Sequence, residues 1–133
     1  MRYVEVDVAA MDDTDGSKAD LIDGSIGEAS TFHATFGYYA QGVVETTAIL
    51  PTGWRDRLVR FETPATNGVV ARCLEIHDLW ISKAIAGRPK DVEFCKALVD
   101  AGLVDGKRLR ESLATLGSLD ERIRSAAAAR IPS

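Results

Sequence analysis

The opening stretch of the chain alternates between apolar and acidic positions. Val4, Val6 and Val8 fall on one face of an expected strand, whereas Glu5 and Asp7 fall on the opposite face. This alternation predicts a strand that presents an acidic surface.

Short apolar runs separated by turn-forming residues continue through the first half. Residues 17–27 carry apolar side chains at helical spacing and end in glycine, which predicts a helix. A short helical turn is expected at 54–57. Aromatic and β-branched residues predict further strands at 32–44, 46–50, 58–62 and 69–74.

From residue 76 onward the apolar spacing changes to three or four and stays helical. Gly87 ends the first expected helix, Pro89 suits the first turn of the next, and Ser118 with Glu121 forms a capping box for the last. Because strands come first and helices follow, we expect an α+β fold in one domain, 1–133. Within it, a mixed β-sheet is expected over residues 1–75 and a helical half over residues 76–133.

An acidic loop, residues 12–16, raises the question of a calcium site. With Gly16 at the turn position of a calcium loop, Met11 and Ile22 would be the first and last ligands, and neither side chain coordinates calcium. A solvated turn is the better interpretation.

Composition excludes several classes of protein. The 133 residues are 46% hydrophobic and 27% charged, as expected of a folded domain. The net charge of −4 argues against strong nucleic-acid binding. Neither a membrane span nor an export signal is visible, so we expect a cytoplasmic protein whose Cys73 and Cys95 are reduced thiols.

Two groups of charged residues are candidates for chemistry. Glu5 and Asp7 stand at alternate positions of a strand, so their carboxylates project in parallel and can share a divalent cation such as magnesium. A solvent-facing strand surface explains the same pattern.

The second group surrounds the turn between two expected helices. Lys83 falls on an otherwise apolar helix face, and Asp91 aligns with the buried stripe of the next helix. Arg88 and Lys90 place cations beside that carboxylate. The structural alternative is that Lys83 extends along the apolar surface to water and that Asp91 stabilises a helix start.

Several longer runs resemble a known family. They are HATFGYYA at 33–40, LPTGWRDRL at 50–58, LEIHDL at 74–79 and SKAIAGRPKDVEF at 82–94. Together they resemble small bacterial nucleotidyltransferase-like proteins, and the last run is distantly similar to the AbiEii-type toxins of abortive-infection systems.

The resemblance implies a polymerase-β-like fold and nucleotidyl transfer. Glu5 and Asp7 would be the catalytic pair that binds Mg²⁺ and a nucleoside triphosphate, whose nucleotidyl group passes to an unknown acceptor. The resemblance also implies nucleotide-binding residues around the second group: Lys83, which neutralises phosphate, and Arg88, Lys90 and Asp91, which support it.

The family pattern also includes segments that are not evident in this sequence. Relatives carry a Gly-Ser segment before the carboxylate strand, whereas here Gly24 and Ser25 follow it. A third carboxylate is expected near Gln41, with Glu45 and Glu62 as candidates. The alternative is therefore a truncated or inactive member that acts through self-association, as a homo-oligomer, or through a protein partner.

Overall fold

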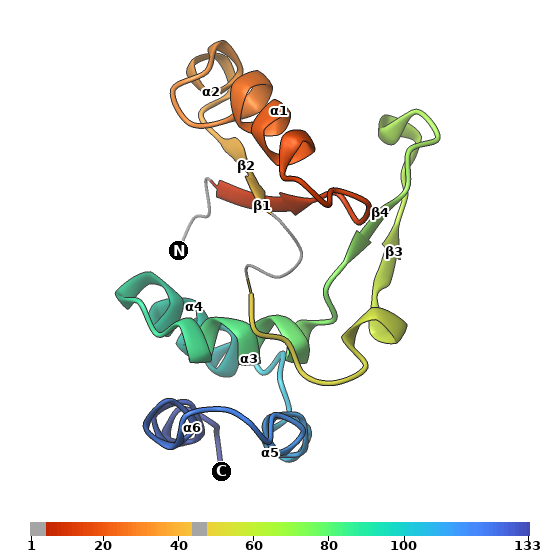
Figure 1. Cartoon of the computed structure of the whole chain (residues 1–133). Coiled ribbons are helices and arrows are strands. Elements are labelled where there is room, and N and C mark those ends of the chain that lie inside the picture. Colours follow the sequence, from red (N-terminus) through yellow and green to blue (C-terminus); the bar gives the residue numbers. More distant parts are fainter. Residues whose placement is uncertain (1–4, 44–47) are drawn as a thin grey trace. The chain divides into compact units, whose positions relative to one another are not determined.

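A computed structural model of the chain describes residues 5–43 and 48–133. The chain divides into two compact units, residues 1–48 and residues 49–133. Each unit has its own strands and helices (Figure 1). The single domain expected over residues 1–133 stays a prediction.

The first unit contains a parallel pair of strands, β1 (Glu5–Ala9) and β2 (Tyr39–Val43). Parallel strands need a crossover connection, and here it contains the helices α1 (Ser17–Ile26) and α2 (Thr31–Phe36). The strand and the first helix predicted from the sequence are confirmed over their described residues; positions 1–4 lie outside these.

The segment before β2 differs from the sequence prediction, because residues 31–36 form a helix and not a strand. The Ser30 side chain accepts a hydrogen bond from the backbone N–H of His33 at 3.1 Å, and Gly37 closes the helix with φ of 77°. A polar N-cap and a left-handed glycine thus override the strand preference of the aromatic side chains. Residues 48–50, expected in a strand, are not in one, and 44–47 lie outside the described residues.

The acidic loop before α1 caps that helix. The two carboxylate oxygens of Asp13 accept the backbone N–H groups of Lys18 and Ala19, each at 2.9 Å. Asp15 accepts the N–H of Ser17 at 3.0 Å. These carboxylates satisfy donors that a helix start leaves without intrahelical partners, which agrees with the predicted turn.

Helix α1 approaches β2 closely at Gly42. The N–H of Gly42 donates to Asp23 Oδ1 at 2.7 Å. A Cβ atom at this position would stand 2.0 Å from the carbonyl oxygen of Ala19. The absence of a side chain at residue 42 therefore allows the helix and the strand to pack at this distance.

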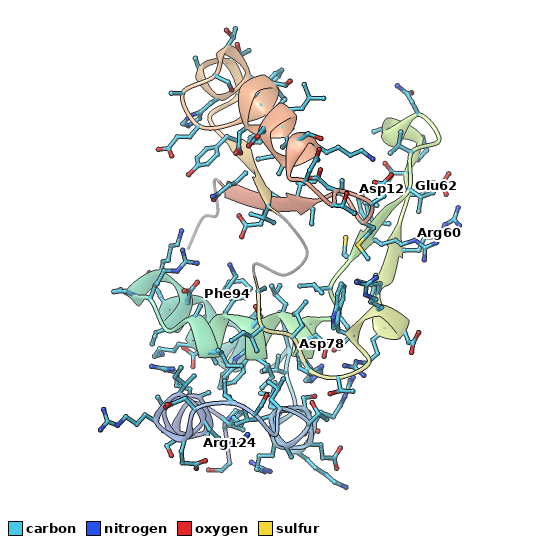
Figure 2. The ribbon with its side chains drawn as sticks, in the orientation of Figure 1. Asp12, Arg60, Glu62, Asp78, Phe94 and Arg124 are labelled. Atoms are coloured by element: carbon cyan, nitrogen blue, oxygen red, sulfur yellow. The ribbon has the colours of Figure 1, made fainter. Side chains whose placement is uncertain are left out.

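The second unit begins with a turn and a hairpin. After the 3₁₀ turn η1 (Trp54–Arg57), β3 (Val59–Phe61) pairs antiparallel with β4 (Ala71–Cys73), and the turn η2 (Pro64–Thr66) lies between them. Figure 2 shows the side chains of Arg60 and Glu62 on this hairpin, joined by an ion pair of 2.6 Å. The strands and the turn predicted here are confirmed.

Helices make up the rest of the second unit: α3 (Ile76–Ala86), α4 (Pro89–Asp100), α5 (Gly106–Ala114) and α6 (Glu121–Ala129). The N-cap of α6 is Asp120, whose carboxylate accepts the N–H of Arg122 at 2.9 Å; the expected capping residue was Ser118. The four predicted helical segments are otherwise confirmed.

The helices enclose one buried apolar cluster at their centre. Trp80 is fully buried and its indole N–H donates to the carbonyl oxygen of Cys95 at 3.1 Å. The cluster consists of Trp80, Ile81, Ala84, Cys95, Leu109, Leu113 and Ala127. The α+β class is confirmed, and no helix in the described part of the chain is long and apolar enough to span a membrane.

Candidate functional site

The predicted carboxylate pair lies on β1 in the first unit. Asp7 is exposed and stands opposite Gln41 of β2 in the parallel register, while Glu5 stands opposite Tyr39. Of the two candidates for a third carboxylate near Gln41, Glu45 lies outside the described residues. Glu62 instead pairs with Arg60 in the second unit.

The residue types of this pair suit magnesium, since hard divalent cations prefer carboxylate oxygens. Two carboxylates at alternate positions of one strand supply such oxygens, so the donor set fits the ion. Within residues 5–43 and 48–133, no group of three or more histidine, cysteine, aspartate or glutamate side chains gathers as a ready metal site.

The other predicted residues meet at the corner between α3 and α4. Gly87 ends α3 with φ of 65° and donates its N–H to the carbonyl oxygen of Lys83 at 3.0 Å. Arg88 then caps α4 and Pro89 occupies its first turn. This reversal brings Lys83 Nζ to within 3.8 Å of Asp91 Oδ1.

Asp91 is the centre of this corner. It is fully buried, and its Oδ2 atom accepts Arg88 Nε at 2.7 Å and the Arg88 backbone N–H at 3.2 Å. A second guanidinium nitrogen of Arg88 donates to Oδ1 at 3.2 Å. Asp91 therefore both caps the helix and contacts two cations, as the structural interpretation expects. Its role in nucleotide binding stays a prediction.

The charge state of Asp91 follows from these contacts. Burial disfavours the ionised carboxylate, but the hydrogen bonds and charge of Arg88, with the charge of Lys83, outweigh it and hold the pKa of Asp91 below its ordinary value. Two cations thus share one carboxylate. Lys90, exposed in the first turn of α4, adds another cation.

Lys83 does not extend freely into water. Its side chain is 20% exposed, whereas that of Arg88 is 55% exposed. A long amine held mainly inside the fold loses less conformational entropy when it contacts a ligand than a free surface lysine does. The corner therefore offers a partly ordered ammonium group suited to an anion.

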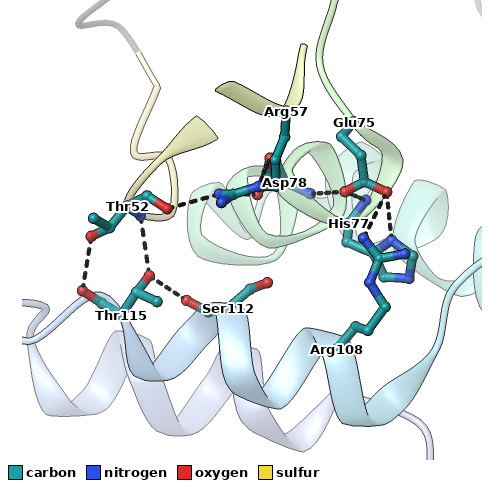
Figure 3. Close-up of polar contacts among 8 residues, drawn as sticks. All are labelled: Thr52, Arg57, Glu75, His77, Asp78, Arg108, Ser112 and Thr115. Atoms are coloured by element: carbon teal, nitrogen blue, oxygen red, sulfur yellow. Dashed lines mark hydrogen bonds and ion pairs between the residues drawn. The ribbon is translucent and has the colours of Figure 1, made fainter. Parts of the chain in front are cut away.

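A second cluster of charged residues, centred on Arg57 and Asp78, was not predicted from the sequence. Arg57 forms two parallel hydrogen bonds to Asp78, Nε to Oδ2 at 2.9 Å and a terminal nitrogen to Oδ1 at 3.0 Å, and also donates to the Thr52 carbonyl at 2.9 Å (Figure 3). The Asp78 side chain is 1% exposed. Both residues lie in runs that carry the family resemblance, which is the signal that points to them.

His77 joins Glu75 to the backbone of Asp105. Its Nε2 accepts the backbone N–H of Asp105 at 3.0 Å, so the proton of the neutral ring is on Nδ1, which donates to Glu75 Oε1 at 2.7 Å. Glu75 also lies 3.4 Å from Arg108 (Figure 3). Burial opposes ionisation of Glu75, but His77 and Arg108 keep its pKa below the ordinary value.

A comparison with family models identifies the family. The model described as a nucleotidyltransferase of unknown function (DUF6036) matches residues 10–127. The chain belongs to this family. No curated protein and no solved structure matches the chain.

The nucleotidyltransferase family match covers one of the two predicted groups. Lys83, Arg88, Lys90 and Asp91 lie inside residues 10–127, whereas Glu5 and Asp7 precede them. The roles of both groups stay predictions.

Proposed function

We propose that this nucleotidyltransferase-family chain transfers a nucleotidyl group from a nucleoside triphosphate to an acceptor hydroxyl in a magnesium-dependent reaction. The observation that carries the proposal is the corner of α3 and α4, where the buried Asp91 fixes Lys83 and Arg88. Several cations grouped around one buried carboxylate suit a polyanion such as a triphosphate.

The chemistry assigned to this group is electrostatic. Lys83 contacts a phosphate oxygen through its ammonium group, and Arg88 and Lys90 add positive charge nearby. Asp91 is a positioning residue, because it acts on the nucleotide through the two cations it holds. Such fixed charges stabilise the negative charge that phosphoryl-type transfer concentrates on the transferred phosphorus and leaving group.

Glu5 and Asp7 are assigned to the metal. When bound, magnesium neutralises phosphate charge and orients the reacting oxygens. In the nucleotidyl transfer, the acceptor oxygen bonds to the α-phosphorus, and the bond from that phosphorus to the α,β-bridging oxygen breaks. Pyrophosphate leaves with the bonding electron pair, and the hydroxyl proton passes to solvent.

The test is calorimetric binding of ATP, GTP, CTP and UTP, each with and without magnesium. We expect at least one of them to bind more tightly with magnesium, and Asp7→Asn to abolish that difference while keeping the side-chain shape. Lys83→Gln should weaken binding roughly tenfold with or without the metal, the size expected for one charge-assisted hydrogen bond.

Lys107→Gln is the matched control, since Lys107 is an exposed cation on α5 outside the corner. It should bind nucleotide as the wild type does. The proposal is overturned if no triphosphate binds, or if Asp7→Asn and Lys83→Gln both bind as tightly as Lys107→Gln.

The alternative proposal is a non-catalytic protein that self-associates. It is favoured by the hairpin, where Val59 and Phe61 are each 52% exposed and occupy the same face of β3. A two-stranded hairpin is marginal alone, and an apolar face of this kind is stabilised when a second copy covers it. Light scattering over a range of concentrations tests this, and a monomer at every concentration contradicts it.

A further inference from the structure

A small hollow in the second unit lies between the end of α3 and one face of α6. Its volume is about 260 Å³, below that of most sites for drug-sized ligands, so it suits a small molecule. On α6 its lining includes Arg122, Ala126 and Arg130, which recur every four residues and so share one helix face. Ala84 and Ile85 of α3 line it from the other side.

The two arginines of the hollow differ in how they are held. Arg130 donates to the carbonyl oxygen of Ala84 at 2.9 Å, which fixes its guanidinium at one end. Arg122 is exposed, and its side chain makes no hydrogen bond or ion pair to any described residue. The other arginines of residues 106–133 all have partners: Arg108, Arg110, Arg124 and Arg130.

Neighbouring carboxylates do not neutralise Arg122. Asp120 accepts backbone N–H groups at the start of α6, and Glu121 pairs with Arg124. Arg124, labelled in Figure 2, donates to the carbonyl oxygen of Leu113 in α5 and to that of Leu116 in the following turn. The hollow therefore keeps guanidinium donors that the fold does not use.

The walls between the arginines are apolar. Ile85, Ile123 and the small Ala126 all line the hollow, and Ile123 is 39% exposed. A guanidinium binds a carboxylate or a phosphate with two parallel hydrogen bonds, and the apolar wall gains free energy when a hydrocarbon covers it.

We propose that this hollow binds a small organic anion, a phosphate or carboxylate head on a compact apolar body, with Arg122 as its main contact to the head. Arg130 supplies a second cationic contact, and Ile123 and Ala126 contact the apolar body. Gly87 of the α3–α4 corner also lines the hollow, but Lys83, Arg88, Lys90 and Asp91 do not. Lys83→Gln and Arg122→Gln therefore test the proposed function and this site separately.

Phenyl phosphate is a suitable probe, with benzoate, inorganic phosphate and phenol as comparison compounds. In NMR titrations of the full chain we expect millimolar phenyl phosphate or benzoate to shift the methyl signals of Ile85, Ile123 and Ala126. Inorganic phosphate and phenol should each bind at least several-fold more weakly, because each offers one of the two contacts. Equal shifts with inorganic phosphate, or none with either organic anion, would overturn the proposal.

Two variants probe the assigned contacts. Arg122→Gln should weaken phenyl phosphate binding roughly tenfold, the value of one charge-assisted contact, whereas Lys107→Gln removes the same charge elsewhere and should leave it unchanged. Ala126→Leu fills the hollow and should abolish binding while the thermal midpoint stays within a few degrees. Binding unchanged in both Arg122→Gln and Ala126→Leu contradicts the site.

Discussion

Arg57 and Asp78 form a two-point ion pair that joins the η1 turn to the first turn of α3. The Arg57 side chain is 37% exposed, whereas the Asp78 side chain is almost fully buried. Two hydrogen bonds of 2.9 and 3.0 Å satisfy the buried oxygens, and the pair raises the pKa of Arg57. The segment before the hairpin is thereby attached to the helical core.

This relationship predicts a strong coupling between the two side chains. Asp78→Asn should lower the free energy of unfolding by about 1–3 kcal/mol, because the amide cannot accept both guanidinium hydrogen bonds. Arg57→Lys should also destabilise, since an ammonium group cannot reproduce the planar two-point contact. Urea unfolding of both single variants and the double variant should give a coupling free energy of about 1–2 kcal/mol.

The hairpin supplies the control for this cycle. Arg60 and Glu62 are also an ion pair, but their side chains are 68% and 38% exposed. Arg60→Lys should change stability by less than about 0.5 kcal/mol, because exposed pairs contribute little. A loss of stability in Arg57→Lys no larger than that in Arg60→Lys would show that burial of the carboxylate does not matter.

Asp91 predicts a dependence of stability on pH. Its folded-state pKa lies below the ordinary 3.8, so the native state holds the ionised form more strongly than the unfolded state does. The resulting stabilisation is present in full above the ordinary pKa and is lost as the pH falls through the lower folded value.

The check compares wild type with Asp91→Asn by urea unfolding at neutral pH and at about pH 3. The variant should be less stable at neutral pH by about 1–3 kcal/mol. The difference in stability should narrow in acid, because Asp91 of the unfolded wild type takes up its proton before Asp91 of the folded protein does. A gap that is constant or grows in acid contradicts this electrostatic role. If Asp91→Glu keeps the wild-type stability at neutral pH, the negative charge at this position stabilises the fold more than the exact side-chain shape does.

The periodic elements were the portion of the fold that the sequence could predict. Helices α3 to α6 show three- and four-residue apolar spacing because one face of each packs on the Trp80 cluster. The grouping of Lys83 with Asp91 was also predictable, since both fall on buried stripes on either side of a Gly87 turn.

The sequence could not predict features that depend on the tertiary structure or on competing local signals. Helix α2 contains aromatic residues that favour strands, and its capping by Ser30 decided the outcome. Arg57 and Asp78 are 21 residues apart, so no local spacing indicated their contact. In the same way, the unpartnered state of Arg122 became visible only with the surrounding helices in place.

The two thiols should differ in reactivity. Cys95 is buried in the apolar cluster, and burial raises its pKa to about 11, whereas Cys73 is exposed on β4. Because the thiolate is the nucleophile, iodoacetamide should modify Cys73 alone in the folded protein and both residues in urea. Peptide mass spectrometry measures this, with Cys73→Ser as the control that should give no folded-state adduct. Rapid folded-state labelling of Cys95 would contradict the packing of that cluster.

The packing of α1 on β2 requires a glycine at position 42. Gly42→Ala places a methyl group 2.0 Å from the Ala19 carbonyl oxygen, so α1 must move off β2, and we expect a loss of about 1–3 kcal/mol or more in the first unit. Gly24→Ala is the matched control, because its Cβ meets nothing within 4 Å and alanine favours the helix by up to about 1 kcal/mol. Amide hydrogen exchange should therefore accelerate over residues 5–43 in Gly42→Ala and slow or stay unchanged in Gly24→Ala. Equal protection in the two variants would mean that the close contact between α1 and β2 is absent in solution.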